Sequence, residues 1–170
     1  IVNWNTCALL RTCIQSIHKF SPKEPLEIVV VDNASADGSA EMVRQEFPEV
    51  RLIASDKNTG YAKGNNMAFS AAQGEWLLTL NPDTEFVDDS LQKAIDILSA
   101  SPKAGCLAAR LVHPDDRTQK SVRGWPTARG IIGDFTGLGA RLPGSKLDSY
   151  RLTAFDYEKA QEAPQPMGTF

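Results

Sequence analysis

The sequence predicts an α/β domain in which a mostly parallel β-sheet is flanked by helices. Two observations support this class: short apolar runs alternate with segments of helical periodicity, and most of these runs end at a polar residue. Strands that alternate with helices are joined by right-handed crossovers, which leave neighbouring strands parallel. The chain has 170 residues, of which 42% are hydrophobic, so it carries enough apolar material for the core of one such domain.

The first two strand–helix units occupy the start of the chain. Residues 1–5 resemble the last half of a strand, and Thr6 is placed to cap a helix whose apolar residues keep helical spacing up to Phe20. Residues 26–33 are a β-branched run with a polar stop, and residues 35–47 follow as a capped helix. The same unit is therefore repeated.

Three further strands are predicted after these units. Residues 50–55 form a short strand, and residues 58–74 form a glycine-containing turn that leads into an alanine-rich helix. Residues 75–83 predict a fourth strand, residues 89–101 a helix with one apolar face, and residues 104–112 a fifth strand.

The pattern changes after residue 112. Glycine, proline and arginine become frequent and neither period is sustained, so residues 113–170 should be loop-rich, as binding surfaces often are. Both ends of the chain resemble apolar segments that are cut short. We therefore expect the chain to be a fragment of something longer.

The overall charge and the cysteines exclude several classes of protein. A formal charge of -3 and a pI near 5.4 leave no basic surface for nucleic acid, and the apolar runs are too short to cross a membrane. The three cysteines, Cys7, Cys13 and Cys106, are odd in number and lack C-x-x-C spacing. We interpret them as reduced core residues of a cytoplasmic protein.

Polar residues follow the carboxyl ends of four successive predicted strands. They are Asn3, Asn5, Asp32, Asn33, Asn58, Asn81 and Asp83. In an open α/β sheet this edge is where ligands bind. A single residue of this kind is more often a helix cap or a turn residue, but four groups on one edge favour a ligand site.

Asp32 directly follows three valines, where no helix cap is needed. Its carboxylate could accept hydrogen bonds from a nucleobase or a sugar hydroxyl. Asp37, Gly38 and Ser39 lie a few residues later and are interpreted as a turn and helix cap.

The segment NTGYAKGNN, residues 58–66, places Gly60, Lys63 and Gly64 at a strand-to-helix turn. Glycines let backbone amides approach a ligand, and a lysine beside a helix N-terminus adds positive charge where a phosphate would lie. The segment matches neither the P-loop nor the dinucleotide-binding pattern. The alternative is a glycine-rich turn with Lys63 in solvent.

Asn81, Pro82 and Asp83 end the fourth predicted strand. Pro82 has no N–H, so it interrupts the ladder of hydrogen bonds and moves both neighbours out of the sheet at the ligand edge. One carboxylate, completed by waters and phosphates, is the oxygen shell that Mg²⁺ or Mn²⁺ prefers. These residues predict either a cation that bridges a nucleotide diphosphate or an ordinary polar turn.

The chain resembles the family 2 glycosyltransferases with a GT-A fold, especially their rhamnosyltransferase-like bacterial members. The resemblance lies in four segments in the same order: IVNWNT, VVVDNASADGS, NTGYAKGNN and LLTLNPDTEF. It is close over residues 1–112, which would be the half that binds a nucleotide sugar. It is looser over residues 113–170, which would be an acceptor-side segment of the same domain.

The resemblance implies a role for the polar residues at the strand ends. Asn3, Asn5 and Asp32 would hold the nucleoside of the donor, with Asp32 at the base. Asp83 would be the principal protein ligand of a divalent metal, Mg²⁺ or Mn²⁺. Asn81 stands where the family pattern has the first Asp of its metal motif, so the site carries one charge fewer.

The resemblance likewise places residues 58–66 along the ribose and diphosphate of the donor. The residues implied are Gly60, Lys63, Gly64 and Asn66. In the implied reaction the metal and Lys63 would stabilise the negative charge on the departing diphosphate while a carboxylate base takes the acceptor's proton.

The implied activity is transfer of a sugar from a nucleoside-diphosphate-sugar to an acceptor hydroxyl with inversion, in the synthesis of surface polysaccharide. A saccharide or lipid-linked acceptor suggests peripheral attachment at the inner face of the membrane, although the sequence shows no amphipathic basic helix. The catalytic base is expected beyond Phe170, and Arg123 and Trp125 either line a sugar site or belong to a surface loop. The alternative hypothesis is a nucleotide-binding module without catalysis.

Overall fold

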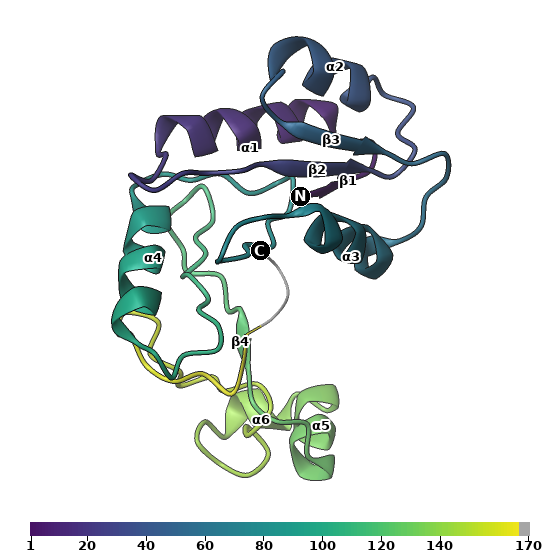
Figure 1. The fold of residues 1–170 in the computed structure, drawn as a ribbon. Coiled ribbons are helices and arrows are strands. Elements are labelled where there is room, and N and C mark those ends of the chain that lie inside the picture. Colours follow the sequence, from purple (N-terminus) through teal and green to yellow (C-terminus); the bar gives the residue numbers. More distant parts are fainter. Residues whose placement is uncertain (167–170) are drawn as a thin grey trace. The chain divides into compact units, whose positions relative to one another are not determined.

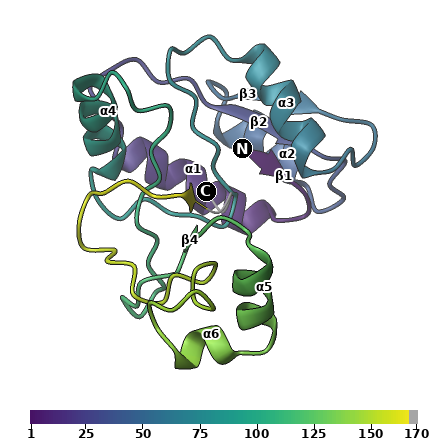
Figure 2. The same ribbon diagram turned by 90° about the horizontal axis from the view of Figure 1, so that it is seen from below.

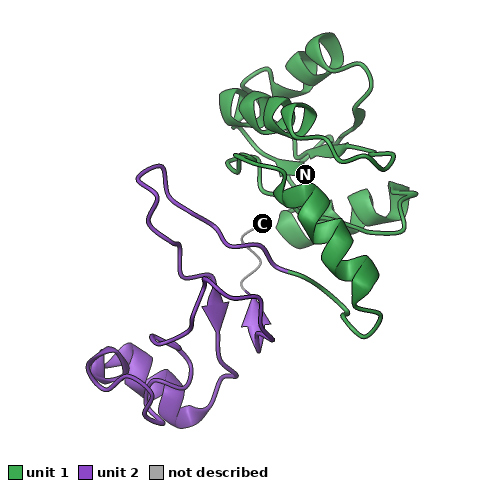
Figure 3. Cartoon of the chain, turned by 90° about the vertical axis from the view of Figure 1, so that its left-hand side faces the viewer, with its two compact units in different colours: residues 1–107, 170 green, residues 108–169 purple. Residues whose placement is uncertain are grey.

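The computed structural model describes residues 1–166, in two compact units. Unit 1 comprises residues 1–107, and the described part of unit 2 runs from Ala108 to Pro166 (Figure 3). The boundary lies close to the change of pattern expected after residue 112.

A parallel sheet forms the centre of unit 1. It contains β1 (Val2–Asn3), β2 (Val29–Asp32) and β3 (Arg51–Ala54), in the order β1-β2-β3 (Figure 1). The register places Asn3 beside Asp32, so the last residues of β1 and β2 are direct neighbours. The first three predicted strands and their parallel arrangement are confirmed.

Helices cover both faces of this sheet. The helices of unit 1 are α1 (Cys7–Lys19), α2 (Ser39–Glu46), α3 (Tyr61–Ala71) and α4 (Ser90–Ala100). α1 and α2 lie on one face of the sheet and α3 lies on the other (Figure 1; Figure 2). This is the arrangement expected for alternating strands and helices.

The valines of β2 explain why both faces need a helix. Val30 and Val31 are both fully buried, and because successive strand residues point to opposite faces, they enter different clusters. Val30 packs among Leu10 and Val43 of the two helices on one face, whereas Val31 packs with Ala68 of α3 on the other.

The start of α1 is capped by a distant residue. The backbone N–H of Cys7 donates to the Asp37 carboxylate at 2.8 Å, whereas the Thr6 hydroxyl donates to Asn3 at 2.6 Å. The predicted side-chain cap from Thr6 is therefore wrong. Asp37 also accepts from the N–H and the hydroxyl of Ser39. Burial opposes the charge, but these bonds outweigh it and lower the pKa of the Asp37 carboxyl.

The fourth and fifth predicted strands are not formed within the described residues. In the segment 75–83, Trp76 and Leu77 are exposed, and the chain is held by Leu80, which is buried with Cys13 and Ile17 of α1. Apolar residues alone do not make a strand, because a strand needs a paired edge, and β1 at the edge of the sheet has two residues.

The predicted strand at residues 104–112 is also wrong. Its last residue, Val112, forms an isolated bridge with Thr118, so that it pairs locally within unit 2. Cys106 in this segment is exposed, which corrects its interpretation as a core residue. Cys13, in contrast, is fully buried, and burial raises the pKa of its thiol to about 12.

Unit 2 is rich in loops, as expected. Its regular elements among the described residues are β4 (Val122–Arg123), α5 (Ala128–Phe135), α6 (Leu138–Arg141) and β5 (Gln165–Pro166). β4 and β5 pair antiparallel, and the Thr127 hydroxyl accepts from the N–H of Gly130 at the start of α5. No helix in the described part of the chain has the length and apolar character required to span a bilayer.

Candidate functional site

A buried hydrogen-bond network joins the ends of β1 and β2. The Asn3 amide donates to Asp32 Oδ1 at 2.9 Å and to Ser35 Oγ at 3.1 Å. Asp32 Oδ2 accepts from the Ser35 backbone N–H at 3.0 Å. The exposed fractions of Asn3 and Asp32 are 0% and 3%, so both side chains are held in fixed positions inside the fold. Asn3 and Asp32, which were expected at the same edge of the sheet, are therefore in direct contact.

Asn5 continues the network towards solvent. Its backbone N–H donates to Ser35 Oγ at 2.9 Å, and its side-chain oxygen accepts from the N–H of Ala36 at 2.8 Å. Asn5 and Ala34 have φ values of 54° and 62°, in the left-handed region that residues other than glycine adopt at a cost. Two such residues in facing loops show that the sheet edge beside Asp32 is shaped by tertiary contacts.

Asn33 connects β2 with the turn before α3. Its side-chain oxygen accepts from the N–H and the hydroxyl of Thr59, both at 3.1 Å, and its amide donates to the Gly60 carbonyl at 3.3 Å. Asn58 braces the same turn, because its side-chain oxygen accepts from the Gly60 N–H at 2.9 Å. The sequence placed Asn33 and Asn58 at strand ends, but it did not reveal that both hold this turn.

The two predicted glycines of this segment serve different purposes. Gly60 has a φ of 82°, which a side chain would disfavour, so it permits the turn into α3. Gly64 is buried, and a Cβ there would lie 2.8 Å from Cγ1 of Val2. Close packing of α3 on β1 therefore accounts for Gly64. Asn66 lies exposed on α3, whereas its neighbour Asn65 is buried and donates to the Tyr61 carbonyl.

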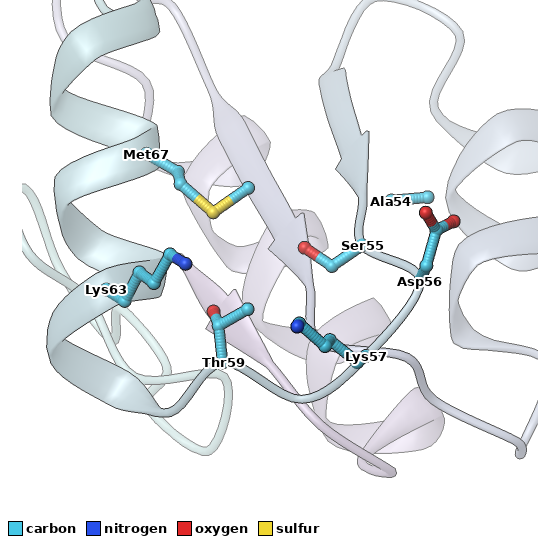
Figure 4. Close-up of a pocket in the computed structure, with 7 residues that line it drawn as sticks. All are labelled: Ala54, Ser55, Asp56, Lys57, Thr59, Lys63 and Met67. Atoms are coloured by element: carbon cyan, nitrogen blue, oxygen red, sulfur yellow. The ribbon is translucent and has the colours of Figure 1, made fainter.

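A pocket of about 500 Å³ lies between the end of β3 and the start of α3 (Figure 4). Lys63 and Thr59 line it from the α3 side, and Ser55, Asp56 and Lys57 line it from the loop after β3. Both lysine side chains extend towards the pocket in Figure 4. The sequence indicated Lys63 as a candidate site residue but did not indicate Lys57, which also lines the pocket. The position of Lys57 directly before Asn58, at the expected ligand edge, could have indicated it.

The Ser55 hydroxyl gives this pocket an unused polar group. Its oxygen is buried and has no hydrogen-bond partner among the described residues, and it faces the pocket in Figure 4. An unpaired buried hydroxyl costs free energy, so its position favours a ligand that would supply the missing partner. The pocket therefore combines two lysines and one carboxylate, that of Asp56, with a hydroxyl that lacks a partner.

Asn81 and Asp83 lie in a tight turn after the segment that packs on α1. The Asn81 carbonyl accepts from the N–H of Thr84 at 3.2 Å and faces the Cys13 sulfur at 3.8 Å. Asp83 is exposed. No cluster of three acidic, His or Cys side chains that could hold a metal occurs within residues 1–166. Asp83 can offer one hard oxygen donor, as a metal completed by water and phosphate requires.

The sequence model for glycosyl transferase family 2 matches residues 1–160. The chain belongs to this family. The resemblance drawn from the four segments is thereby confirmed. The Asn3–Asp32 network and the pocket beside Lys63 both lie within the residues that the family model matches.

Relatives of known name support the same family. The chain is 28% identical over 158 residues to the N-acetylglucosaminyl-diphospho-decaprenol L-rhamnosyltransferase of Mycobacterium tuberculosis. The matched region covers 86% of this chain and 50% of that protein. It is 28% identical over 141 residues to the O-antigen biosynthesis protein RfbC of Myxococcus xanthus, covering 79% of this chain and 10% of that one. The chain thus spans about half the length of the rhamnosyltransferase.

Solved structures confirm the GT-A fold of this family 2 chain. The mannosyltransferase PcManGT from Pyrobaculum calidifontis, in complex with GDP-Man and Mn²⁺, aligns with a TM-score of 0.58 and 27% identity over 68% of this chain and 35% of that one. TarS of S. aureus in complex with UDP-GlcNAc aligns with a TM-score of 0.59 and 22% identity over 71% of this chain and 36% of that one. At that identity TarS supports the fold alone.

Proposed function

We propose that this chain binds the nucleoside-diphosphate-sugar donor of an inverting glycosyltransferase that acts in cell-surface polysaccharide synthesis. The observation that carries the proposal is the combination, in a family 2 chain, of a buried Asn3–Asp32 network at the sheet edge with a lysine-lined pocket at the end of β3. The first can orient a nucleoside and the second can hold negative charge.

The nucleoside half of the donor would be held at the ends of β1 and β2. Each oxygen of the Asp32 carboxylate accepts one hydrogen bond within the fold, and a carboxylate has about four acceptor positions. Its remaining lone pairs are available to a donor group on the base. Asn3 fixes the carboxylate from one side, and Asn5 shapes the exposed rim of the same edge.

The diphosphate would be held at the start of α3. The first N–H groups of a helix have no partner within the helix and create a local positive potential. Gly60 allows the chain to enter α3 with these groups open to a ligand, and Lys63 adds a full charge. Gly64 supports this site by packing α3 on β1, and Asn66 offers an exposed amide on the same helix.

A divalent metal, Mg²⁺ or Mn²⁺, would be held by Asp83, with Asn81 as a neutral neighbour. The exposed carboxylate suits a cation whose remaining ligands are waters and phosphate oxygens. When bound, such a cation supplies charge that stabilises the departing diphosphate.

The acceptor would be a saccharide or a lipid-linked sugar, bound at least in part by unit 2. Arg123 ends β4 and Trp125 follows two residues later; Trp125 is 67% exposed, as a sugar-stacking residue would be. A lipid-linked acceptor would place the enzyme at the cytoplasmic face of the membrane as a peripheral protein. We assign no catalytic base to a residue of this chain.

Isothermal titration calorimetry tests donor binding directly. We expect one of UDP, GDP or dTDP to bind in the presence of Mn²⁺ and NAD(H) not to bind. Lys63→Gln should weaken diphosphate binding about tenfold, because a charge-assisted hydrogen bond is lost. Lys103→Gln, a substitution of another exposed lysine, is the matched control.

Two outcomes would contradict the proposal. Binding of NAD(H) in place of every nucleoside diphosphate would remove the glycosyltransferase reading. Nucleotide binding without any sugar transfer, by this chain and by the full-length gene product alike, would favour a nucleotide-binding module over an enzyme.

A further inference from the structure

Unit 2 carries an exposed apolar surface on α5 and α6, which we call the α5–α6 patch. It consists of Ile131, Ile132, Phe135, Leu138 and Leu142, with exposed fractions of 49%, 56%, 92%, 42% and 51%. Five large apolar side chains this close in sequence are more than the scattered exposure of an ordinary surface, and such patches mark interaction sites.

The orientation of α5 follows from its glycines. At about 100° per residue, Ile131, Ile132 and Phe135 share one face of the helix, while Gly130 and Gly133 lie on the opposite face. Both glycines are buried. A Cβ on Gly133 would lie 2.1 Å from the backbone oxygen of Leu147, and one on Gly130 would lie 2.7 Å from Ser149 Oγ.

This packing is directional. The Leu147 backbone oxygen approaches Gly133, and the Ser149 hydroxyl approaches Gly130, so closely that only a glycine face of α5 fits there, and the large side chains must point outward. Rotating α5 to bury Phe135 would force side chains into these atoms. The apolar face is therefore a fixed feature of unit 2.

Basic residues flank the patch in the sequence, and two of them, Arg129 and Arg141, belong to α5 and α6. Residues 120–147 contain five basic side chains and one acid, in a chain whose overall formal charge is -3. The acid, Asp134, is already paired with Arg151 at 2.6 Å. The basic residues are Lys120, Arg123, Arg129, Arg141 and Lys146, and none of them forms an ion pair with a described residue.

We propose that the α5–α6 patch docks on a membrane surface that carries anionic lipid head groups. Apolar side chains of a helix that lies in the interface enter the acyl boundary, while flanking lysine and arginine side chains meet the head groups. Trp125, exposed beside the start of α5, is of the residue type that favours this boundary. The inference extends the proposed use of a lipid-linked acceptor and specifies the surface that makes the contact.

Charge complementarity favours a lipid surface over a second copy of the chain. A symmetric dimer brings the same patch of both copies together, so Arg129 and Arg141 of one copy would face those of the other. Like charges in such an interface are repelled, whereas anionic head groups attract them.

Vesicle co-sedimentation of the full chain tests the inference, without donor or acceptor present. We expect binding to vesicles of phosphatidylglycerol and phosphatidylcholine, weaker binding at high salt, and little binding to phosphatidylcholine alone. The double variant Ile132→Gln, Phe135→Gln should lower the partition coefficient about tenfold. Arg129→Gln with Arg141→Gln should lower binding to anionic vesicles alone.

Val87→Gln is the matched control, because Val87 is 71% exposed but lies in unit 1. Absent binding by the parent chain, or equal binding by the parent and the Ile132/Phe135 variant, would overturn the inference. A concentration-dependent dimer that the same variant abolishes would assign the patch to a second copy instead. Nucleotide binding measured on the same samples would separate failure of membrane docking from failure of the proposed donor site.

Discussion

Replacing Asn33 with alanine should destabilise unit 1 by about 2 to 4 kcal/mol. The side chain is 2% exposed and makes three hydrogen bonds, two from Thr59 and one to the Gly60 carbonyl. Alanine removes all three and leaves the N–H of half-buried Thr59 and the carbonyl of exposed Gly60 without their side-chain partner. At about 1 kcal/mol for each lost bond, with a further penalty for an unpaired group, the range above follows.

Urea unfolding followed by circular dichroism measures this loss. Asn33→Asp is an informative second variant, because the carboxylate keeps the two bonds from Thr59 but loses the donor to Gly60. That carboxylate would also be buried without a cation and would face the Gly60 carbonyl oxygen, so the free energy of unfolding should fall at least as far as in the alanine variant. Asn58→Ala is the matched control: Asn58 is exposed and makes one bond to the same turn, so its loss should cost about 1 kcal/mol or less.

The same variant also tests the link between this turn and the pocket. If Asn33 holds Thr59 and Gly60 in place, nucleotide affinity should fall in Asn33→Ala even under conditions where the protein remains folded. A loss of stability below about 0.5 kcal/mol, or the same loss for Asn58→Ala, would refute the role assigned to Asn33.

The remaining predictions concern a metal ligand, two thiols and a carboxyl group. Asp83→Ala should abolish the Mn²⁺-dependent part of diphosphate binding in calorimetry and leave the urea midpoint unchanged, because the residue is exposed; unchanged metal dependence would remove Asp83 from the site. Iodoacetamide should alkylate Cys106 in the native protein but Cys13 only after unfolding, because Cys13 is buried and burial raises the pKa of its thiol to about 12. Peptide mapping that found equal labelling of the two thiols in the native protein would contradict this. The pKa of the Asp37 carboxyl lies below its ordinary value of 3.8, so its contribution to stability is present above pH 3.8 and is lost as the pH falls through the lowered pKa. Asp37→Asn should make the urea midpoint less dependent on pH in that acidic range, and an unaltered dependence would show that other groups cause it.

Local patterns predicted the strand–helix units correctly because their signals lie within one element. The valines before Asp32 indicated a buried strand, and the spacing of Leu10 and Ile14 indicated a helix with one apolar face. Which segments pair as strands of the sheet cannot be predicted from local patterns in this way. Residues 75–83 have the composition of a strand, but Leu80 packs on α1 and no ladder forms with β1.

Long-range hydrogen bonds were the other source of error. The cap of α1 comes from Asp37, thirty residues along the chain from Cys7, although Thr6 stands at the position where a cap was expected. In the same way Asn33 holds a turn that begins 26 residues later. A polar residue at a strand end signals that it has a partner, but not which one.

By itself the sequence determined the α/β class, the family and the edge of the sheet on which the polar residues gather, because these depend on periodicity and on the order of short segments. The tertiary structure decided which groups meet. It joined Asn3 to Asp32, brought Lys57 and Ser55 to the same pocket as Lys63, and turned Phe135 outward by packing the glycine face of α5 against Leu147 and Ser149. Such contacts depend on how distant segments fit in three dimensions, and no local spacing specifies that fit.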